Sequence, residues 1–161
     1  MKNTIKVLAI ISIICFLVVS VCTCGSAEKL KYYAEKDNYI SVTGIVESVI
    51  NSSERSGLYI DFSDLNPSLD DTCFKIVGEN LNIVRKNGIE EKLKEEDEVV
   101  FITAPRYFGD GYVMPIVAIS INGESLLDFN DGYANLMNWL YDSWDVNQGK
   151  RCYMLPEEVL W

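Results

Sequence analysis

Two long apolar segments joined by a short polar connection occupy residues 98–104 and 112–121 of the sequence. In the first, EVVFITA, apolar residues fill both alternating positions, so both faces of an extended chain would be apolar. The second, YVMPIVAISI, is rich in β-branched residues, which favour a pleated sheet. Such segments are typical of strands that are covered on both faces or that belong to a barrel. We therefore predict a β-hairpin around which the chain builds a small barrel.

Particular residues indicate where the predicted strands bend and turn. Pro115 cannot donate a ladder hydrogen bond, so it predicts an edge or a bulge in its strand. Gly44 lies inside an alternating segment and predicts a bulge or a tight bend there. The pair Asn122-Gly123 predicts a two-residue turn that returns the chain into another strand.

Shorter periodic segments fill the rest of the chain. Alternation and composition predict strands at residues 39–50, 58–62, 73–77 and 124–129. Helical spacing predicts a short helix that begins near Asn80 and ends at Gly88, a residue suited to a left-handed cap. A longer helix is predicted from Asp131 to Trp144, and we expect it to pack on the barrel through an apolar face that includes Leu136, Met137 and Leu140.

The first 27 residues have the pattern of a targeting segment. Lys2 and Lys6 precede an apolar run from Val7 to Cys22, which is long for the hydrophobic region of a signal peptide and short for a full membrane span. We predict export, with the chain retained on the extracytoplasmic face of the membrane or else secreted.

Three outcomes of processing fit this segment. A lipoprotein signal would place the lipidated residue at Cys24 (or Cys22), ordinary cleavage would follow Ala27, and an uncleaved segment would act as an anchor. Residues 28–38 would then form a tether, either as helical turns or without regular structure. The predicted organisation is a targeting segment at 1–27, this tether, a barrel at 39–129, and a C-terminal helix and tail at 130–161.

Charge and composition argue against several functions. The chain has 14 basic and 24 acidic residues, and Lys2 and Lys6 lie in the targeting segment, which has no acidic residue. The remainder therefore carries 12 basic and 24 acidic residues, a formal charge of −12, which repels nucleic-acid phosphates. Histidine is absent, and with it the commonest general base and transition-metal ligand.

The order of three strands, a short helix and two strands is that of the OB-fold, a five-stranded Greek-key barrel. The segment ISVTGIVESV resembles the first strand of tRNA-anticodon-binding-like OB domains in exported bacterial proteins and lipoproteins, and KLKEEDEVVFITAPRYFGDGYV resembles their last two strands. This resemblance covers residues 39–129. It implies a mostly β protein, with a five-stranded OB-like barrel, a short helix between strands three and four, and an added C-terminal helix.

Candidate chemical groups are few. Cys73 and Cys152 are the cysteines that remain under every one of the three processing outcomes, and the sequence is equally compatible with a disulfide and with two free thiols. Aspartates at 61, 64, 70 and 71 do not match a calcium-binding loop, so solvated turns explain them better than a metal. We expect no enzymatic activity, metal or cofactor, and we keep a metal-dependent hydrolase as the least favoured alternative.

The resemblance also implies where a ligand would bind. OB-folds bind ligands on the face of strands two and three, between the loops that here span residues 51–57 and 105–111. The side chains that these segments would bring together are Arg55, Tyr59, Arg106, Tyr107 and Phe108. Aromatic and arginine residues are common anchors of protein interfaces and also stacking platforms for bases. We therefore expect a binding module for a protein, peptide or cell-envelope ligand, with a single-stranded nucleic-acid binder as the alternative.

A different role fits the same loop residues. Aromatic side chains at a loop tip often cover the mouth of a barrel, so Tyr107 and Phe108 would then fold back and close its end.

Overall fold

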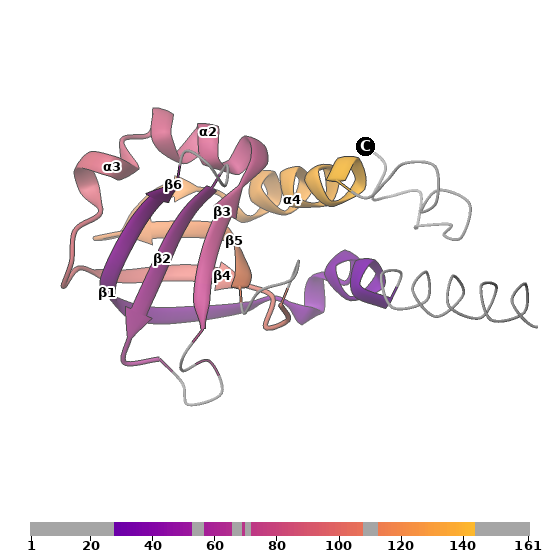
Figure 1. Cartoon of the computed structure of the whole chain (residues 1–161), viewed down its shortest axis with the longest axis horizontal. Helices are drawn as coiled ribbons and strands as arrows, with labels where there is room; N and C mark the ends of the chain where they lie inside the picture. The colour runs from indigo at the N-terminus through magenta and orange to yellow at the C-terminus, as the bar shows by residue number, and fades with distance from the viewer. Residues whose placement is uncertain (1–27, 53–56, 66–68, 70–71, 108–112, 144–161) are drawn as a thin grey trace, which may run out of the picture.

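The computed structural model describes residues 28–52, 57–65, 69, 72–107 and 113–143, which are coloured in Figure 1. Residues 28–34 are helical and lead into a short 3₁₀ turn, η1. The elements that follow correspond to every strand and helix expected from the sequence, with ends that differ by a few residues. They are η1 (Lys36–Asn38), β1 (Ile40–Ser52), β2 (Gly57–Ser63), β3 (Cys73–Val77), α2 (Gly78–Lys86), α3 (Ile89–Lys92), β4 (Glu98–Thr103), β5 (Val113–Ile121), β6 (Glu124–Leu127) and α4 (Phe129–Ser143).

The strands form one continuous set of pairings. β1 pairs antiparallel with β2 and with β4, β2 pairs antiparallel with β3, and β4 pairs antiparallel with β5. The start of β5 also pairs with β3, in parallel, which completes a ring of hydrogen bonds through β1, β2, β3, β5 and β4. β6 pairs with the end of β5. The prediction of a mostly β protein is therefore confirmed.

β1 takes part in both halves of the ring because it bends. Its first part pairs with β4 and its second part with β2, and a register shift between Val46 and Ser48 marks a bulge at Glu47. The bulge lies at Glu47 and not at Gly44. Gly44 has another role, because a Cβ there would lie 2.8 Å from Leu65 Cδ2, so glycine lets these chains approach closely.

β5 bends beside the C-terminal helix. A register shift in its pairing with β4 leaves Val117 unpaired, two residues after Pro115. The backbone oxygen of Val117 lies only 1.8 Å from where a Cβ on Gly132 would sit. Helix α4 can therefore cross β5 this closely only because residue 132 has no side chain. The predicted turn after β5 is present, with left-handed φ values of 53° at Asn122 and 79° at Gly123.

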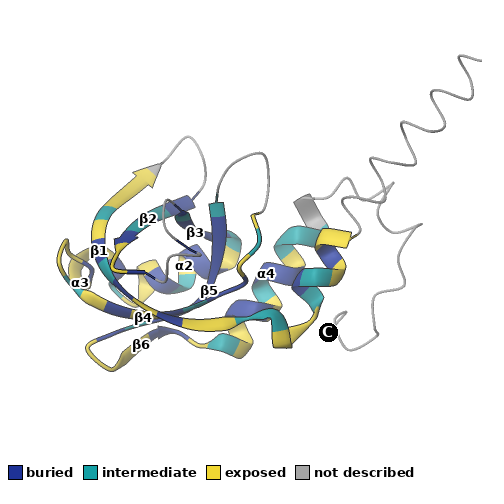
Figure 2. Cartoon of the chain, turned by 90° about the horizontal axis from the view of Figure 1, so that it is seen from below, coloured by how far each residue is buried: buried dark blue, intermediate teal, exposed yellow. Residues whose placement is uncertain are grey.

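The core inside the ring consists of aliphatic, methionine and phenylalanine side chains. Phe62 stacks on Phe101 with 4.4 Å between ring centroids, and Phe74 meets Phe101 edge to face at 4.9 Å. Figure 2 shows buried residues along the inward sides of the strands. We call this group the ring core. Its members are Val42, Val46, Leu58, Ile60, Phe62, Leu65, Leu69, Phe74, Ile76, Leu81, Val84, Ile89, Leu93, Val99, Phe101, Met114, Ile116, Ile119, Ile121, Leu126 and Leu127.

A second buried group lies at one end of the ring, where Figure 1 shows the N-terminal helical residues and α4 on the same side. Its buried members, which we call the end cluster, are Leu30, Tyr33, Val77, Ala104, Val117, Tyr133, Leu136 and Met137. Residues 28–34 thus take the helical form expected as one alternative, and they also pack against the domain. Tyr133 Oη donates to the backbone oxygen of Ala34 at 2.7 Å, and Tyr39 Oη donates to that of Tyr33 at 2.9 Å.

The C-terminal helix docks as the sequence predicts. Leu136 and Met137 are each 1% exposed, whereas Leu140 is only half-buried. The fully buried Asn80 of α2 donates through Nδ2 to the backbone oxygen of Gly132 at 2.8 Å and accepts from Asn135 at 3.1 Å. A buried amide with both ends satisfied fixes the position of α4 against α2.

Candidate functional site

The outer face of β1, β2 and β3 carries half-buried polar side chains. Alternation along β2 sends Leu58, Ile60 and Phe62 into the ring core and leaves Tyr59 and Asp61 outside. The register aligns Tyr59 with Ile50 of β1 and with Lys75 of β3, and aligns Asp61 with Ser48. We call this surface the β1–β3 face, and its members are Ser48, Ile50, Tyr59, Asp61, Cys73 and Lys75.

Asp61 is the centre of a hydrogen-bond network on this face. Ser48 Oγ donates to Asp61 Oδ2 at 2.8 Å, and the Cys73 thiol also bonds to Asp61. Burial raises the pKa of Cys73 to about 12, the hydrogen bond and the negative charge of Asp61 add to this, and Lys75 opposes it. The thiol is therefore protonated at neutral pH and can act as a hydrogen-bond donor.

Lys75 lies across β2 towards Tyr59. Its Nζ is 4.7 Å from the centroid of the Tyr59 ring, a cation–π distance. Gly57 makes room for the lysine chain, because a Cβ at that position would lie 2.1 Å from Lys75 Cε. The face therefore offers an aromatic ring with a cation held over it.

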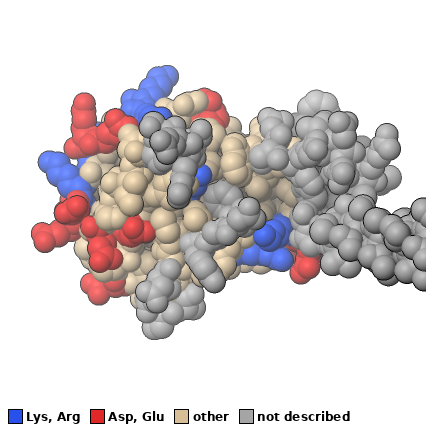
Figure 3. Space-filling model, in the orientation of Figure 1, with Lys and Arg blue, Asp and Glu red and all other residues tan. Residues whose placement is uncertain are grey.

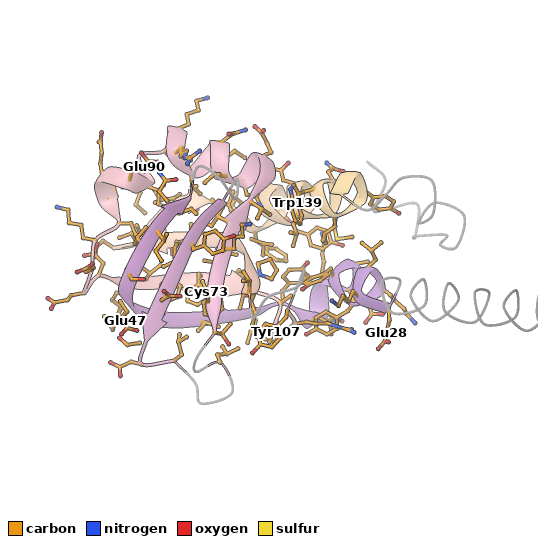
Figure 4. The ribbon with its side chains drawn as sticks, in the orientation of Figure 1. Glu28, Glu47, Cys73, Glu90, Tyr107 and Trp139 are labelled. Atoms are coloured by element: carbon orange, nitrogen blue, oxygen red, sulfur yellow. The ribbon has the colours of Figure 1, made fainter. Side chains whose placement is uncertain are left out.

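Tyr107 borders the β1–β3 face at the start of β3. Its side chain is 37% exposed, and its hydroxyl lies 3.5 Å from Oγ1 of the buried Thr72, the residue before Cys73. Figure 4 shows Tyr107 beside the end of β3 at which Cys73 begins the strand. That Tyr107 and Tyr59 contact one ligand stays a prediction. The structure places Tyr107 near the start of β3, and Lys75 of β3 pairs with Tyr59.

Arg106 turns instead towards the N-terminal helical residues. Its guanidinium carbon lies 5.1 Å from the centroid of Tyr32, and Nη2 lies 3.6 Å from Glu28 Oε1. Its backbone oxygen accepts a hydrogen bond from Tyr33 Oη. Arg106 therefore makes contacts within the chain, and its neighbour Tyr107 is the one on the open surface.

The other predicted site residues lie outside the described part of the chain. These are Arg55 and Phe108 of the two flanking loops, Cys152 of the candidate disulfide, and Cys22 and Cys24 of the candidate lipidation site. The sequence reasoning did not include Asp61, Ser48 or Lys75 in the binding surface. Alternation along β2 already puts Asp61 beside Tyr59, whereas the places of Ser48 and Lys75 depend on strand register.

Charged side chains are unevenly distributed on this side of the molecule. Figure 3, drawn in the orientation of Figure 1, shows acidic and basic side chains together along the left edge, with uncharged residues to the right of them. The sequence has 24 acidic residues against 14 basic ones.

A shallow hollow lies on another side of the ring, over β4, β5 and β6. It has a volume of about 360 Å³, and Val100, Ile102, Ala118 and Ser120 are among the residues that line it. Val100 is 42% exposed there. Ser120 Oγ donates to the backbone oxygen of Val100 at 3.3 Å on this surface, which supplies control positions for the β1–β3 face.

Within the described ranges, no three His, Cys, Asp or Glu side chains converge in a way that could hold a metal ion. A search of the same residues for a helix long and apolar enough to cross a membrane finds none. No protein-family model, curated protein or solved structure matches the chain.

Proposed function

We propose that this chain is an exported, non-catalytic binding module built on an OB-type barrel, with its ligand on the β1–β3 face. The barrel proposal is supported by the ring of pairings through β1, β2, β3, β5 and β4, with α2 and α3 between the third and fourth strands. An OB barrel binds its ligands on the face of strands two and three. Those strands correspond here to β2 and β3.

The observation that carries the binding proposal is the composition of that face. Tyr59 and Tyr107 supply aromatic surface with a polar end, and Lys75 and Asp61 supply one charge of each sign. Side chains of this kind anchor protein interfaces, because they bury a large area and keep a hydrogen-bonding group. We propose a protein, peptide or cell-envelope component as the ligand.

Two features favour binding over catalysis and over nucleic acid. The Cys73 thiol has a raised pKa, so it lacks the thiolate that a cysteine nucleophile needs. The charge of −12 derived above for residues 28–161 repels a phosphate backbone. Asp61 is already bonded to Ser48 and Cys73, which fits a structural and recognition role better than a general base.

Export and retention on the membrane are proposed from the N-terminal sequence. The apolar run after Lys2 and Lys6, followed by Cys22 and Cys24, supports a lipoprotein or an uncleaved anchor. Fractionation of cells that express the Cys22→Ser, Cys24→Ser double variant tests whether an attached lipid retains the chain on the membrane. Release from the membrane indicates a lipid anchor, unchanged retention indicates an uncleaved segment, and a cytoplasmic parent protein contradicts export.

Photo-crosslinking tests the binding face directly. A photoreactive phenylalanine analogue at position 59, on the β1–β3 face, is expected to give a discrete adduct in intact cells. The matched control has the same analogue at position 100, on the hollow over β4 and β5, where Val100 is 42% exposed. Adding Tyr107→Ala to the position-59 protein should reduce the adduct without lowering the melting temperature. Adducts from position 100 but not from position 59, or from neither, contradict the proposal.

A further inference from the structure

The β4–β5 connection is bound to the N-terminal helical residues by three separate contacts. Tyr33 Oη donates to the backbone oxygen of Arg106, the guanidinium of Arg106 lies 5.1 Å from the ring of Tyr32, and it lies 3.6 Å from Glu28. All three contacts converge on Arg106. The next residue, Tyr107, is the one that reaches Thr72 at the start of β3.

These contacts differ in strength. Glu28 is 74% exposed at its side chain, so its ion pair with Arg106 is weak and sensitive to salt. Tyr33 is 1% exposed, and its ring packs in the end cluster with Leu30 and Leu136. The Tyr33 hydroxyl is thus held by a rigid buried ring and bonds to a backbone atom, which restricts the position of the connection more than a flexible side chain could.

The hydroxyl of Tyr33 stays a donor over the whole physiological range. Burial raises its pKa above the usual value for tyrosine; the charge of Arg106 opposes this rise and Tyr32 adds to it. The bond to Arg106 therefore does not depend on pH near neutrality.

We infer that residues 28–34 are a positioning element for the binding face, acting through the bond from Tyr33 to Arg106 to hold Tyr107 against Thr72. The functional part of this inference depends on the proposed function, because Tyr107 borders the proposed ligand site. The segment that connects the domain to the predicted targeting region is then also the segment that sets one flank of the binding face. Tyr33 acts on the ligand only through Arg106 and Tyr107.

The sharpest variant is Tyr33→Phe, which removes the bond to Arg106 and keeps the buried ring. Its matched control is Tyr133→Phe, which removes an equivalent bond from a tyrosine hydroxyl, accepted by the backbone oxygen of Ala34 at 2.7 Å and not by an atom of the β4–β5 connection. Amide hydrogen exchange at Arg106 and Tyr107 is measured on the full-length chain. We expect exchange to be about three- to tenfold faster in Tyr33→Phe and within about twofold of the parent in the control.

A second variant covers the case in which Tyr33→Phe unfolds the protein. Tyr32→Leu removes the stacking of Arg106 on a half-buried ring, and it should give a smaller acceleration at the same amides. Equal exchange in parent, Tyr33→Phe and Tyr32→Leu overturns the inference. So does equal acceleration in Tyr33→Phe and Tyr133→Phe, which would indicate general loosening of the end cluster.

The effect on ligand binding is read separately. Tyr33→Phe, combined with the photoreactive analogue at position 59, should lower the adduct yield, and Tyr133→Phe should not. If exchange accelerates and the yield stays equal, residues 28–34 do not position the binding face. If the parent gives no adduct at all, the proposed function fails while the exchange comparison still decides whether Tyr33 holds the β4–β5 connection.

Discussion

The ring core and the end cluster are built from different chemistry. The ring core contains only aliphatic, methionine and phenylalanine side chains, which pack without needing any particular polar partner. The end cluster contains Tyr33 and Tyr133, and their hydroxyls donate to the backbone oxygens of Arg106 and Ala34, 73 and 99 residues away. Packing of the first kind tolerates volume-conserving changes, whereas the second depends on individual hydrogen bonds.

The two regions consequently do different work in the molecule. The ring core stabilises the sheet by burying apolar area. The end cluster attaches two peripheral helical segments, residues 28–34 and α4, to one end of that sheet. Substitutions that separate these roles therefore differ in the size and in the kind of effect they produce.

The largest effect is expected in the ring core, from Phe101→Ala. Phe101 is fully buried and contacts both Phe62 and Phe74. The free energy of unfolding should fall by about 3–5 kcal/mol, measured by denaturant titration. The control is Val100→Thr, a β-branched change at the adjacent exposed position, which should alter it by less than about 0.5 kcal/mol. Equal losses in the two variants would mean that the ring interior is not the main core.

An intermediate effect is expected where α4 crosses β5, from Gly132→Ala. In a helix this change usually stabilises, by roughly 0.5–1 kcal/mol. Here the added Cβ would overlap the backbone oxygen of Val117, so we expect a loss of about 1–3 kcal/mol in thermal or denaturant unfolding. The control is Ala134→Gly, at an exposed position of the same helix, where only the helix propensity of the residue changes. It should lower the free energy of unfolding by about 1 kcal/mol. Stabilisation by Gly132→Ala would contradict the close crossing.

The smallest effect is expected from Tyr39→Phe, which removes one hydrogen bond beside the end cluster. The bond from Tyr39 Oη to the backbone oxygen of Tyr33 should contribute about 0.5–1.5 kcal/mol at pH 7. The comparison variant is Phe74→Leu, which removes apolar volume from the ring core and no hydrogen bond, and the free energy of unfolding is measured for both.

The same variant has a distinct dependence on pH. Burial and three neighbouring tyrosines raise the pKa of Tyr39, so above about pH 10 the unfolded chain releases this proton while the folded chain keeps it. The parent therefore loses stability as the pH rises through this range, and Tyr39→Phe lacks that contribution. The difference between the two should shrink from pH 9 to pH 11 in denaturant titrations. A constant difference would show that Tyr39 does not titrate with folding.

The candidate site was only partly accessible to sequence reasoning. Tyr59 and Tyr107 could be proposed because strand alternation and loop composition are local properties, and both lie beside the start or middle of β3 in the structure. Arg106 was grouped with them from its neighbours in the sequence. Its side chain instead contacts Tyr32 and Glu28. The sequence could not predict these contacts, because residues more than 70 positions apart leave no local pattern.

The sequence by itself determined which segments are strands and helices. Alternation at 58–62 and 98–103, the Asn122-Gly123 turn and the apolar face of α4 are set by backbone preferences and by residue spacing. Only the tertiary structure decided that β3 and β5 pair in parallel, that Gly132 lies against Val117, and that residues 28–34 pack on the domain. Those outcomes depend on which surfaces meet after the chain has folded, and single-residue spacing carries no information about such distant partners.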